Sequence, residues 1–299
     1  MPGPAEYGVP ITLAPGLRRI LAPNPSAMTG PGTNSYLVGQ GDVALIDPGP
    51  DDRAHLGAIM AALGAGERIS HILVTHAHRD HSGLSKALAA ATGAPVLAFG
   101  DARAGRSAAM KDLAQRDLQS GGEGSDSDFC PDNCLADKTV VTGGDWQITA
   151  HHTPGHFGNH LCFQWGDQLF SGDHVMGWST SIIAPPDGDM AAYLETLDKI
   201  AALDAACFHP GHGASIDTPK ARIDELAAHR AARRAAILAA LQQSKGSAAD
   251  LAARVYCDIP NGLLPAADRN VFAHLIELKD ENLAKTRPDF IFTSEFSAI

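Results

Sequence analysis

Short apolar runs separated by polar and alanine-rich stretches divide the first half of the chain into alternating elements. Apolar runs of this length, bounded by turn residues, predict buried strands, and four occur: SYLV from Ser35, VALI from Val43, ISHILV from Ile69 and APVLAF from Ala94. Alanine-rich helical patterns lie between them: HLGAIMAAL from His55 and LSKALAAA from Leu84. Interleaved strands and helices predict a layered α/β domain.

The second half repeats this rhythm after a polar interruption. The predicted strands are TVV from Thr139, WQITA from Trp146, HLCFQW from His160 and QLFS from Gln168. A helix near 189–203 follows, with Asp189 as its cap. The stretch from about 101 to 138, which includes SGGEGSDSD from Ser120, is predicted to be a polar insertion and is assigned no chemistry.

The last 81 residues have a different, helical pattern. Thr218 and Pro219 begin a predicted long helix that runs to about Ser244. Two further helices, Ser247 to Tyr256 and Pro265 to Ala284, precede a β-like run, FIFT from Phe290. We therefore expect two units: residues 1–218, and a small winged-helix-like module at 219–299. Many such modules only pack against their own enzyme, and we favour that role over nucleic-acid binding.

Composition and charge narrow the class of protein. Hydrophobic residues make up 44% of the 299 and charged residues 19%, as in ordinary globular proteins. No apolar run approaches the ~20 residues that span a bilayer, and MPGPAEYG is unlike a signal peptide, so we expect a cytoplasmic protein without a membrane partner. Residues 1–218 carry 12 Lys and Arg against 24 Asp and Glu, and the remainder 11 against 10. The acidic body disfavours non-specific nucleic-acid binding.

The strongest chemical signal is VTHAHRDHSG, Val74 to Gly83, directly after a predicted buried strand. Imidazole nitrogens and carboxylate oxygens are zinc ligands, and a tetrahedral site needs three or four of them. In an extended turn, His76 and His78 project the same way, while Asp80 and His81 reach a neighbouring point. One loop can thus supply ligands to two adjacent metals.

This H-x-H-x-D-H pattern resembles the signature of the metallo-β-lactamase superfamily, and the resemblance extends over roughly residues 20–217. TPGH from Thr153 supplies His156, SGD from Ser171 supplies Asp173, and HPGHG from His209 supplies His212. IDPG from Ile46 matches a turn of the superfamily whose aspartate, here Asp47, holds the ligand-bearing loop in place without itself binding metal. The resemblance implies an α/β fold, an αββα sandwich of two mixed sheets with helices outside.

The resemblance also implies a ligand set and a mechanism. One zinc would take His76, His78 and His156, the other would take Asp80, His81 and His212, and Asp173 would bridge them. Two metals about 3.5–4 Å apart can share a hydroxide that attacks the substrate at neutral pH. Asp80 would also orient this hydroxide as the catalytic residue. We expect two zinc ions per chain, with iron or manganese as alternatives.

Finer features resemble the β-lactamase-like protein 2 group within the superfamily: MTGPGTNSYLV from Met28, HRDHSG, HRAARR from His229 and the winged-helix-like tail. Some members of that group are described as endoribonucleases acting on single-stranded RNA. The loop MGWSTSIIAPP, Met176 to Pro186, mixes apolar and hydroxyl side chains, which suits a small molecule. We therefore predict hydrolysis of an ester, lactone or thioester, with Trp178 and His160 as candidate pocket residues.

Three alternatives stay open from the sequence. RNA hydrolysis would need phosphate contacts, and the run 219–234 offers Lys220, Arg222, Arg230, Arg233 and Arg234, although a solvated helix looks the same. A mononuclear iron enzyme that oxidises persulfides could use His76, His78 and either Asp173 or His156. A non-catalytic binding protein built on the tail is disfavoured because all seven ligands are kept. The sequence leaves the oligomeric state open.

Overall fold

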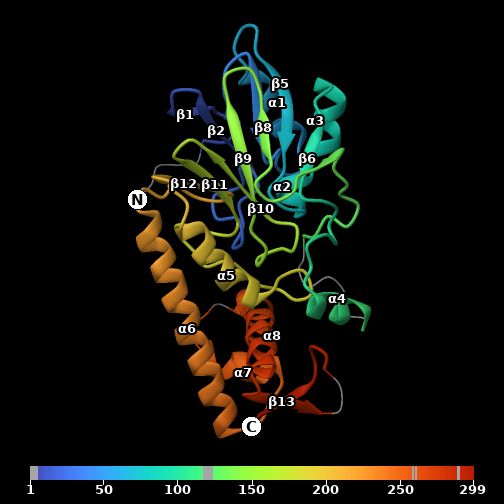
Figure 1. Cartoon of the computed structure of the whole chain (residues 1–299), viewed down its shortest axis with the longest axis vertical. Helices are drawn as coiled ribbons and strands as arrows, with labels where there is room; N and C mark the ends of the chain where they lie inside the picture. Colours follow the sequence, from blue (N-terminus) through green and yellow to red (C-terminus); the bar gives the residue numbers. More distant parts are fainter. Residues whose placement is uncertain (1–5, 117–123, 258, 260, 288–289) are drawn as a thin grey trace.

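Two β-sheets face each other in the first 210 residues of the computed structural model, which describes residues 6–116, 124–257, 259, 261–287 and 290–299 (Figure 1). The first sheet has the order β1-β2-β3-β4-β5-β6-β7. Its strands are β1 (Ile11–Ala14), β2 (Leu17–Leu21), β3 (Asn34–Val38), β4 (Asp42–Ile46), β5 (Arg68–Leu73), β6 (Val96–Ala98) and β7 (Asn133–Cys134). The second has the order β12-β11-β10-β9-β8. Its strands are β8 (Val140–Thr142), β9 (Gln147–His152), β10 (Leu161–Trp165), β11 (Gln168–Gly172) and β12 (Cys207–Pro210).

Apolar side chains from both sheets form the core between them. Tyr36 and Ile46 of the first sheet belong to the same buried cluster as Ile148, Phe163 and Phe170 of the second. Both sheets contain parallel and antiparallel pairs. Strand β3 is buried along its whole length because its outer face is also covered. The predicted pair of mixed sheets is therefore confirmed.

Helices cover the outer faces of the sandwich. Ile59 of α1 (Arg53–Ala61) and Leu88 of α3 (Ser85–Thr92) lie in the buried cluster against the first sheet. Tyr193 and Leu197 of α5 (Met190–Ala201) lie in the cluster against the second. Asp189 caps α5, because its carboxylate accepts from the backbone of Ala191 and Ala192. The four layers are those of the αββα arrangement.

The C-terminal module lies at the lower end of the molecule in Figure 1. It comprises α6 (Pro219–Gln243), α7 (Ala248–Val255), a short 3-10 turn (Asn261–Leu263), α8 (Leu264–Asp280) and the hairpin of β13 (Ala284–Arg287) and β14 (Glu295–Ala298). Two expectations were wrong in detail. The last helix ends at Asp280 instead of Ala284, and FIFT is no strand: it lies between β13 and β14, where Phe290 and Phe292 pack against Phe272.

Helix α6 belongs to both units. Ile223 and Leu226 in its first half pack in the cluster that contains α5, whereas Ile237 and Leu241 in its second half pack with α7 and α8. The predicted boundary at 218 and 219 therefore coincides with the start of α6, but the two units share this helix without a linker. Among the described residues, no helix is both long enough and apolar enough to cross a membrane.

The described part of the polar insertion contains regular structure, whereas residues 117–123, which include the first four of SGGEGSDSD, lie outside the described residues. Helix α4 (Ala108–Gln115) places Met110 and Leu113 in the core of the C-terminal module. Residues 124–126 lie along the loop of residues 74–83, which carries the first four predicted ligands and is called the metal loop below. The backbone N–H of Arg79 donates to the carbonyl of Gly124, and the backbone N–H of Asp126 donates to the carbonyl of Ala77.

Candidate metal centre

Strand ends from both sheets bring the predicted ligands to one edge of the sandwich. Strands β4 and β5 run parallel, so Asp47 and the loop with His76 and His78 leave the first sheet at the same edge. Strands β11 and β12 are also parallel, and Asp173 and His212 follow them. Carboxyl ends of parallel strands are the usual place for ligand sites in α/β proteins. Asp80 and His81 lie on the short helix α2 (Arg79–Ser82), and His156 on the loop between β9 and β10.

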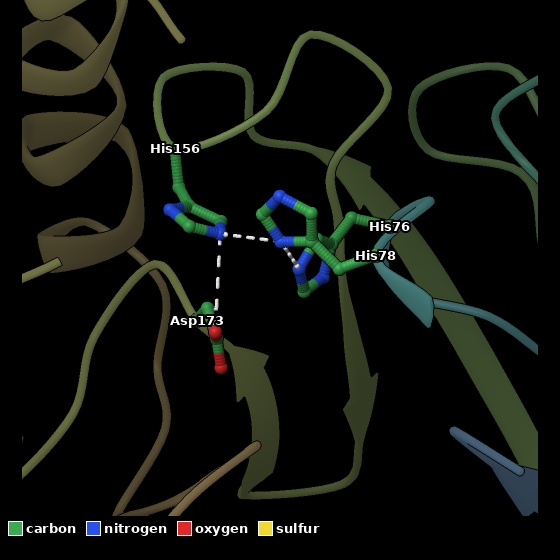
Figure 2. A group of neighbouring side chains, drawn as sticks. All are labelled: His76, His78, His156 and Asp173. Atoms are coloured by element: carbon green, nitrogen blue, oxygen red, sulfur yellow. Dashed lines mark hydrogen bonds and ion pairs between the residues drawn. The ribbon is translucent and has the colours of Figure 1, made fainter. Parts of the chain in front are cut away.

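The first cluster contains His76, His78, His156 and Asp173, each offering one donor atom within 4.8 Å of the others (Figure 2). His78 Nδ1 lies 2.8 Å from His76 Nε2 and 3.1 Å from His156 Nε2. His156 Nε2 is 3.8 Å from Asp173 Oδ2. Tetrahedral coordination at about 2.0–2.1 Å spaces donor atoms roughly 3.3 Å apart. The observed spacings bracket this value, so the four side chains fit one metal ion.

The second cluster contains Asp80, His81 and His212. Asp80 Oδ2 is 3.2 Å from His212 Nε2 and 3.4 Å from His81 Nε2. Asp173 also reaches this cluster, since its Oδ2 is 3.3 Å from His212 Nε2 and its Oδ1 is 3.5 Å from His81 Nε2. The Asp173 carboxylate thus lies between the two clusters, in the place expected of a bridging ligand.

Four of the five histidines, His76, His81, His156 and His212, bind a neighbouring group through Nδ1, which leaves their Nε2 facing the clusters. His156 Nδ1 donates to the carbonyl of Ile182 at 2.7 Å, and His212 Nδ1 donates to that of Gly32 at 3.2 Å. His81 Nδ1 lies 2.8 Å from Asp47 Oδ2, as expected for Asp47. His76 Nδ1 lies 3.0 Å from Thr75 Oγ1, and the Thr75 hydroxyl in turn donates a hydrogen bond to Asp47 Oδ2. Such partners fix the tautomer and ring orientation of metal-binding histidines.

Two buried atoms at the centre have no hydrogen-bond partner among the described residues: His81 Nε2 and Asp173 Oδ1. Buried polar atoms are normally paired, because leaving one unpaired costs about 1–3 kcal/mol. The two atoms lie 3.5 Å from each other, and His81 Nε2 lies 3.4 Å from Asp80 Oδ2, among the donor atoms of the second cluster. A bound cation would supply the missing partner, so the donor set fits metal ions in chemistry as well as spacing.

The electrostatics differ between the clusters. Burial lowers the pKa of His78 to about 3 and also lowers the pKa values of His76 and His156. Burial opposes protonation of His212 too, but Asp173 and Asp80 outweigh it and raise the pKa of His212 to about 9. For the Asp173 carboxyl, burial is outweighed by His212 and His81, which hold its pKa well below the usual range. The three histidines of the first cluster are thus neutral, whereas His212 of the second cluster is paired with the carboxylates of Asp80 and Asp173.

The two candidate pocket residues, Trp178 and His160, differ in how far they are exposed to solvent. Trp178 is 45% exposed and lies against Gly30 and Gly213, since a Cβ on Gly213 would come within 2.6 Å of the indole. Its indole therefore lies beside the residue that follows His212. His160 is fully buried, with its ring 5.2 Å from that of His76 and its Nδ1 bonded to Thr153. The expectation of a pocket role for His160 was wrong, because it lies in the interior behind His76.

Several supporting residues escaped the sequence analysis. Thr33 donates its hydroxyl to Asp80 Oδ2 at 3.1 Å, and Asn159 accepts from the backbone of Ala77 in the metal loop. Ser125 donates to Asp187, which also pairs with Arg106, so the insertion is bonded to the loop beside the site. These contacts join residues between 47 and 82 positions apart, and no local motif marks them.

Comparisons with known proteins agree with this architecture. The family model described as "Metallo-beta-lactamase superfamily" matches residues 28–212, and "Beta-lactamase associated winged helix domain" matches residues 247–290. In solved structures, a beta-lactamase domain protein from Burkholderia ambifaria superposes with a TM-score of 0.80 at 21% identity, covering 100% of this chain and 95% of the other. A metallo-beta-lactamase family protein from Thermus thermophilus gives 0.77 at 24% identity, covering 96% and 100%. At these identities the likeness shows the fold.

Curated relatives are closer in sequence. The "Beta-lactamase-like protein 2 homolog" of Drosophila melanogaster is 33% identical over 281 residues, covering 88% of this chain and 87% of the relative. The "Atrochrysone carboxyl ACP thioesterase" of Aspergillus fumigatus is 31% identical over 239 residues, covering 77% of this chain and 66% of the relative. This chain thus spans slightly less than two thirds of that fungal relative. Because the family model matches more than half of the chain, from residue 28 to residue 212, and includes all seven candidate ligands, the chain belongs to the metallo-β-lactamase superfamily.

Proposed function

We propose that the protein is a dinuclear zinc hydrolase acting on a small acyl substrate, an ester, lactone or thioester. The observation that carries this proposal is the Asp173 carboxylate between two complete donor clusters, 3.3 Å from His212 and 3.8 Å from His156. Five histidines and two aspartates form a nitrogen and oxygen donor set that suits zinc. Two adjacent zinc ions would lower the pKa of a shared water and polarise the substrate carbonyl.

The protein's own groups have separate tasks in this scheme. Asp80 accepts a hydrogen bond from the Thr33 hydroxyl, which fixes the Asp80 carboxylate within the second cluster. Its pKa would be raised by burial, but His81 and His212 outweigh this and lower it, so Asp80 is an anion that can accept a hydrogen bond from the attacking water. Trp178 offers a half-exposed apolar surface next to His212, suited to the apolar part of an acyl group.

The arginines of α6 argue against a phosphate-binding groove. Arg222 donates to the carbonyls of Met176 and Ser179, and Arg230 is buried. Arg233 donates to the carbonyl of Val255 and stacks on Tyr256, while Arg234 pairs with Glu277 and Glu281. Side chains engaged within the protein in this way are not available to hold an RNA backbone. RNA hydrolysis therefore remains the weaker alternative.

The name of one relative supports thioesters as the substrate class. A relative at 31% identity is named as a thioesterase acting on an acyl carrier protein. A thioester carbonyl is attacked by the same route as an ester carbonyl. We therefore place thioesters first among the acyl substrates of this protein.

A substrate panel tests the proposal. Zinc-loaded protein is assayed in parallel on an aryl thioester, a lactone, a chromogenic β-lactam, a phosphodiester and a single-stranded RNA. We expect kcat/KM for a thioester or ester to exceed that for the phosphodiester by at least about 100-fold. Asp80→Asn and His78→Ala should abolish this activity while leaving the fold intact. Metal-dependent RNA cleavage at low salt, without acyl hydrolysis, would overturn the assignment.

A further inference from the structure

A buried arginine connects the C-terminal module to the loop behind the metal centre. Arg230 on α6 is only 1% exposed. Its guanidinium donates to the carbonyl of Ser181, donates to Asn270 Oδ1 at 3.3 Å and lies 5.1 Å from the ring centre of Tyr193. Charged side chains are rarely fully buried unless they are paired. The contacts of Arg230 therefore hold its side chain in one position at the junction of the two units.

Asn270, on α8, completes the contact from the same module. Its Oδ1 accepts from the backbone N–H of Ile183 at 3.0 Å as well as from Arg230. Its Nδ2 donates to the carbonyl of Ala266 within α8, which orients the side-chain amide. Two helices of the module thus converge on the backbone at Ser181 and Ile183.

The residue between these two anchors is the hydrogen-bond partner of a candidate metal ligand. Ile182 accepts the Nδ1 proton of His156 through its carbonyl, at 2.7 Å. Ser181 adds a second connection, because its hydroxyl lies 2.5 Å from the carbonyl oxygen of Asp173. Three consecutive residues therefore transmit the position of α6 and α8 to His156 and to the backbone of Asp173.

We propose that the winged-helix module is a positioning element of the metal centre: Arg230 and Asn270 hold the carbonyl of Ile182 where it orients His156, and so set the metal affinity of the first cluster. The inference rests on the proposed metal centre and is independent of the substrate. Loss of either side chain leaves a buried backbone group unpaired, which lets the 181–183 loop shift. The loop shift would displace the carbonyl of Ile182, the outer partner of His156, and losing such a partner typically lowers metal affinity about 10–100-fold.

The test measures zinc affinity for one cluster at a time, by competition with a chromophoric chelator. His212→Ala isolates the first cluster, and His156→Ala isolates the second. Arg230→Met and Asn270→Leu are introduced into each background, and thermal unfolding checks that every variant is folded. Arg233→Met is the matched control, because this arginine of the same helix donates to the carbonyl of Val255 and stacks on Tyr256, both of which belong to the module.

We expect Arg230→Met and Asn270→Leu to weaken zinc binding to the first cluster by about 10–100-fold. The second cluster and the Arg233→Met control should change less than about threefold. If Arg230→Met does not fold, Asn270→Leu decides, since it leaves the arginine in place. Unchanged affinity, or an equal loss at both clusters, would overturn the inference while leaving the metal centre standing. A folded wild-type protein that binds no zinc would refute the metal centre and, with it, this inference.

Discussion

Asp47 and His81 are in direct contact behind the metal centre, with Asp47 Oδ2 2.8 Å from His81 Nδ1. The same carboxylate accepts from the backbone N–H and the hydroxyl of Thr75, at 2.8 Å each. One side chain therefore orients a candidate ligand and fixes the start of the loop that carries three more. Its backbone has a positive φ of 52°, a conformation that aspartate and asparagine adopt more readily than most residues.

Asp47→Asn should lower zinc affinity about 10–100-fold without unfolding the protein. Asparagine tolerates the same backbone conformation, but an amide nitrogen in the place of Asp47 Oδ2 donates and cannot accept the hydrogen bond of either His81 or the Thr75 hydroxyl. Competition titration measures the affinity. Asp52→Asn is the control, because Asp52 caps α1 and asparagine caps equally well. Equal affinities in the two variants would show that Asp47 does not act on the metal centre.

Gly211→Ala should disrupt the metal centre although glycine is not a ligand. A Cβ at this position would come within 2.5 Å of both Asp173 Oδ1 and His81 Cε1, and real Cβ atoms do not approach so closely. We expect loss of at least one bound metal, measured by elemental analysis. Gly57→Ala on α1 is the control, since nothing lies within 4 Å of its added methyl. Normal metal content in Gly211→Ala would contradict this geometry.

Acidification should release metal from the second cluster first. The pKa of His212 is raised to about 9, so below pH 9 a proton competes with metal for its nitrogen. The pKa of His78 is lowered to about 3, so its nitrogen stays unprotonated down to about pH 4. Affinity at the second cluster should fall at least about tenfold per pH unit below pH 8, with little change at the first. Dialysis at pH 7.5, 6 and 5 followed by metal analysis checks this. Parallel loss at both clusters would be inconsistent with it.

Trp178→Ala should raise the KM for an apolar thioester about tenfold with little change in kcat, because the indole offers binding surface but belongs to neither donor cluster. Steady-state kinetics with a short and a long acyl chain measure the effect. Val140→Ala, an equally exposed apolar residue on β8, is the control. A kcat loss without a change in KM would place Trp178 in the chemical step instead.

The sequence predicted the strands that contain an apolar run, including the partly exposed β8, but missed β1, β2, β7 and the largely buried β12. Strands β3 to β5 and β9 to β11 coincide with apolar runs because both of their faces are covered or because they cross the central core. Strands β1 and β2 escaped prediction because polar residues, Thr12 in β1 and Arg18 and Arg19 in β2, break the apolar pattern. FIFT was predicted to be β-like because it is a short apolar run, but Phe290 and Phe292 are partly buried against Phe272 from a loop.

The candidate ligands were predicted because they form short motifs at strand ends, and the fold brings them together as the resemblance implied. His160 was misplaced because sequence proximity to His156 does not reveal which way a side chain points. Arg230 and Asn270 could not be found from sequence. Arg230 contacts Ser181, 49 positions away, and Asn270 contacts Ile183, 87 positions away, so no local motif marks either residue. An arginine within a basic run is also expected to be exposed, not buried.

Metal stoichiometry of wild type and His212→Ala tests the central claim, that two adjacent metal positions share Asp173, most directly. Purified protein is saturated with zinc, dialysed and analysed for metal per chain. We predict about two zinc ions per wild-type chain and about one after His212→Ala, because only the second cluster loses a ligand. One metal per chain in both proteins, or a single iron in the wild type, would contradict the claim.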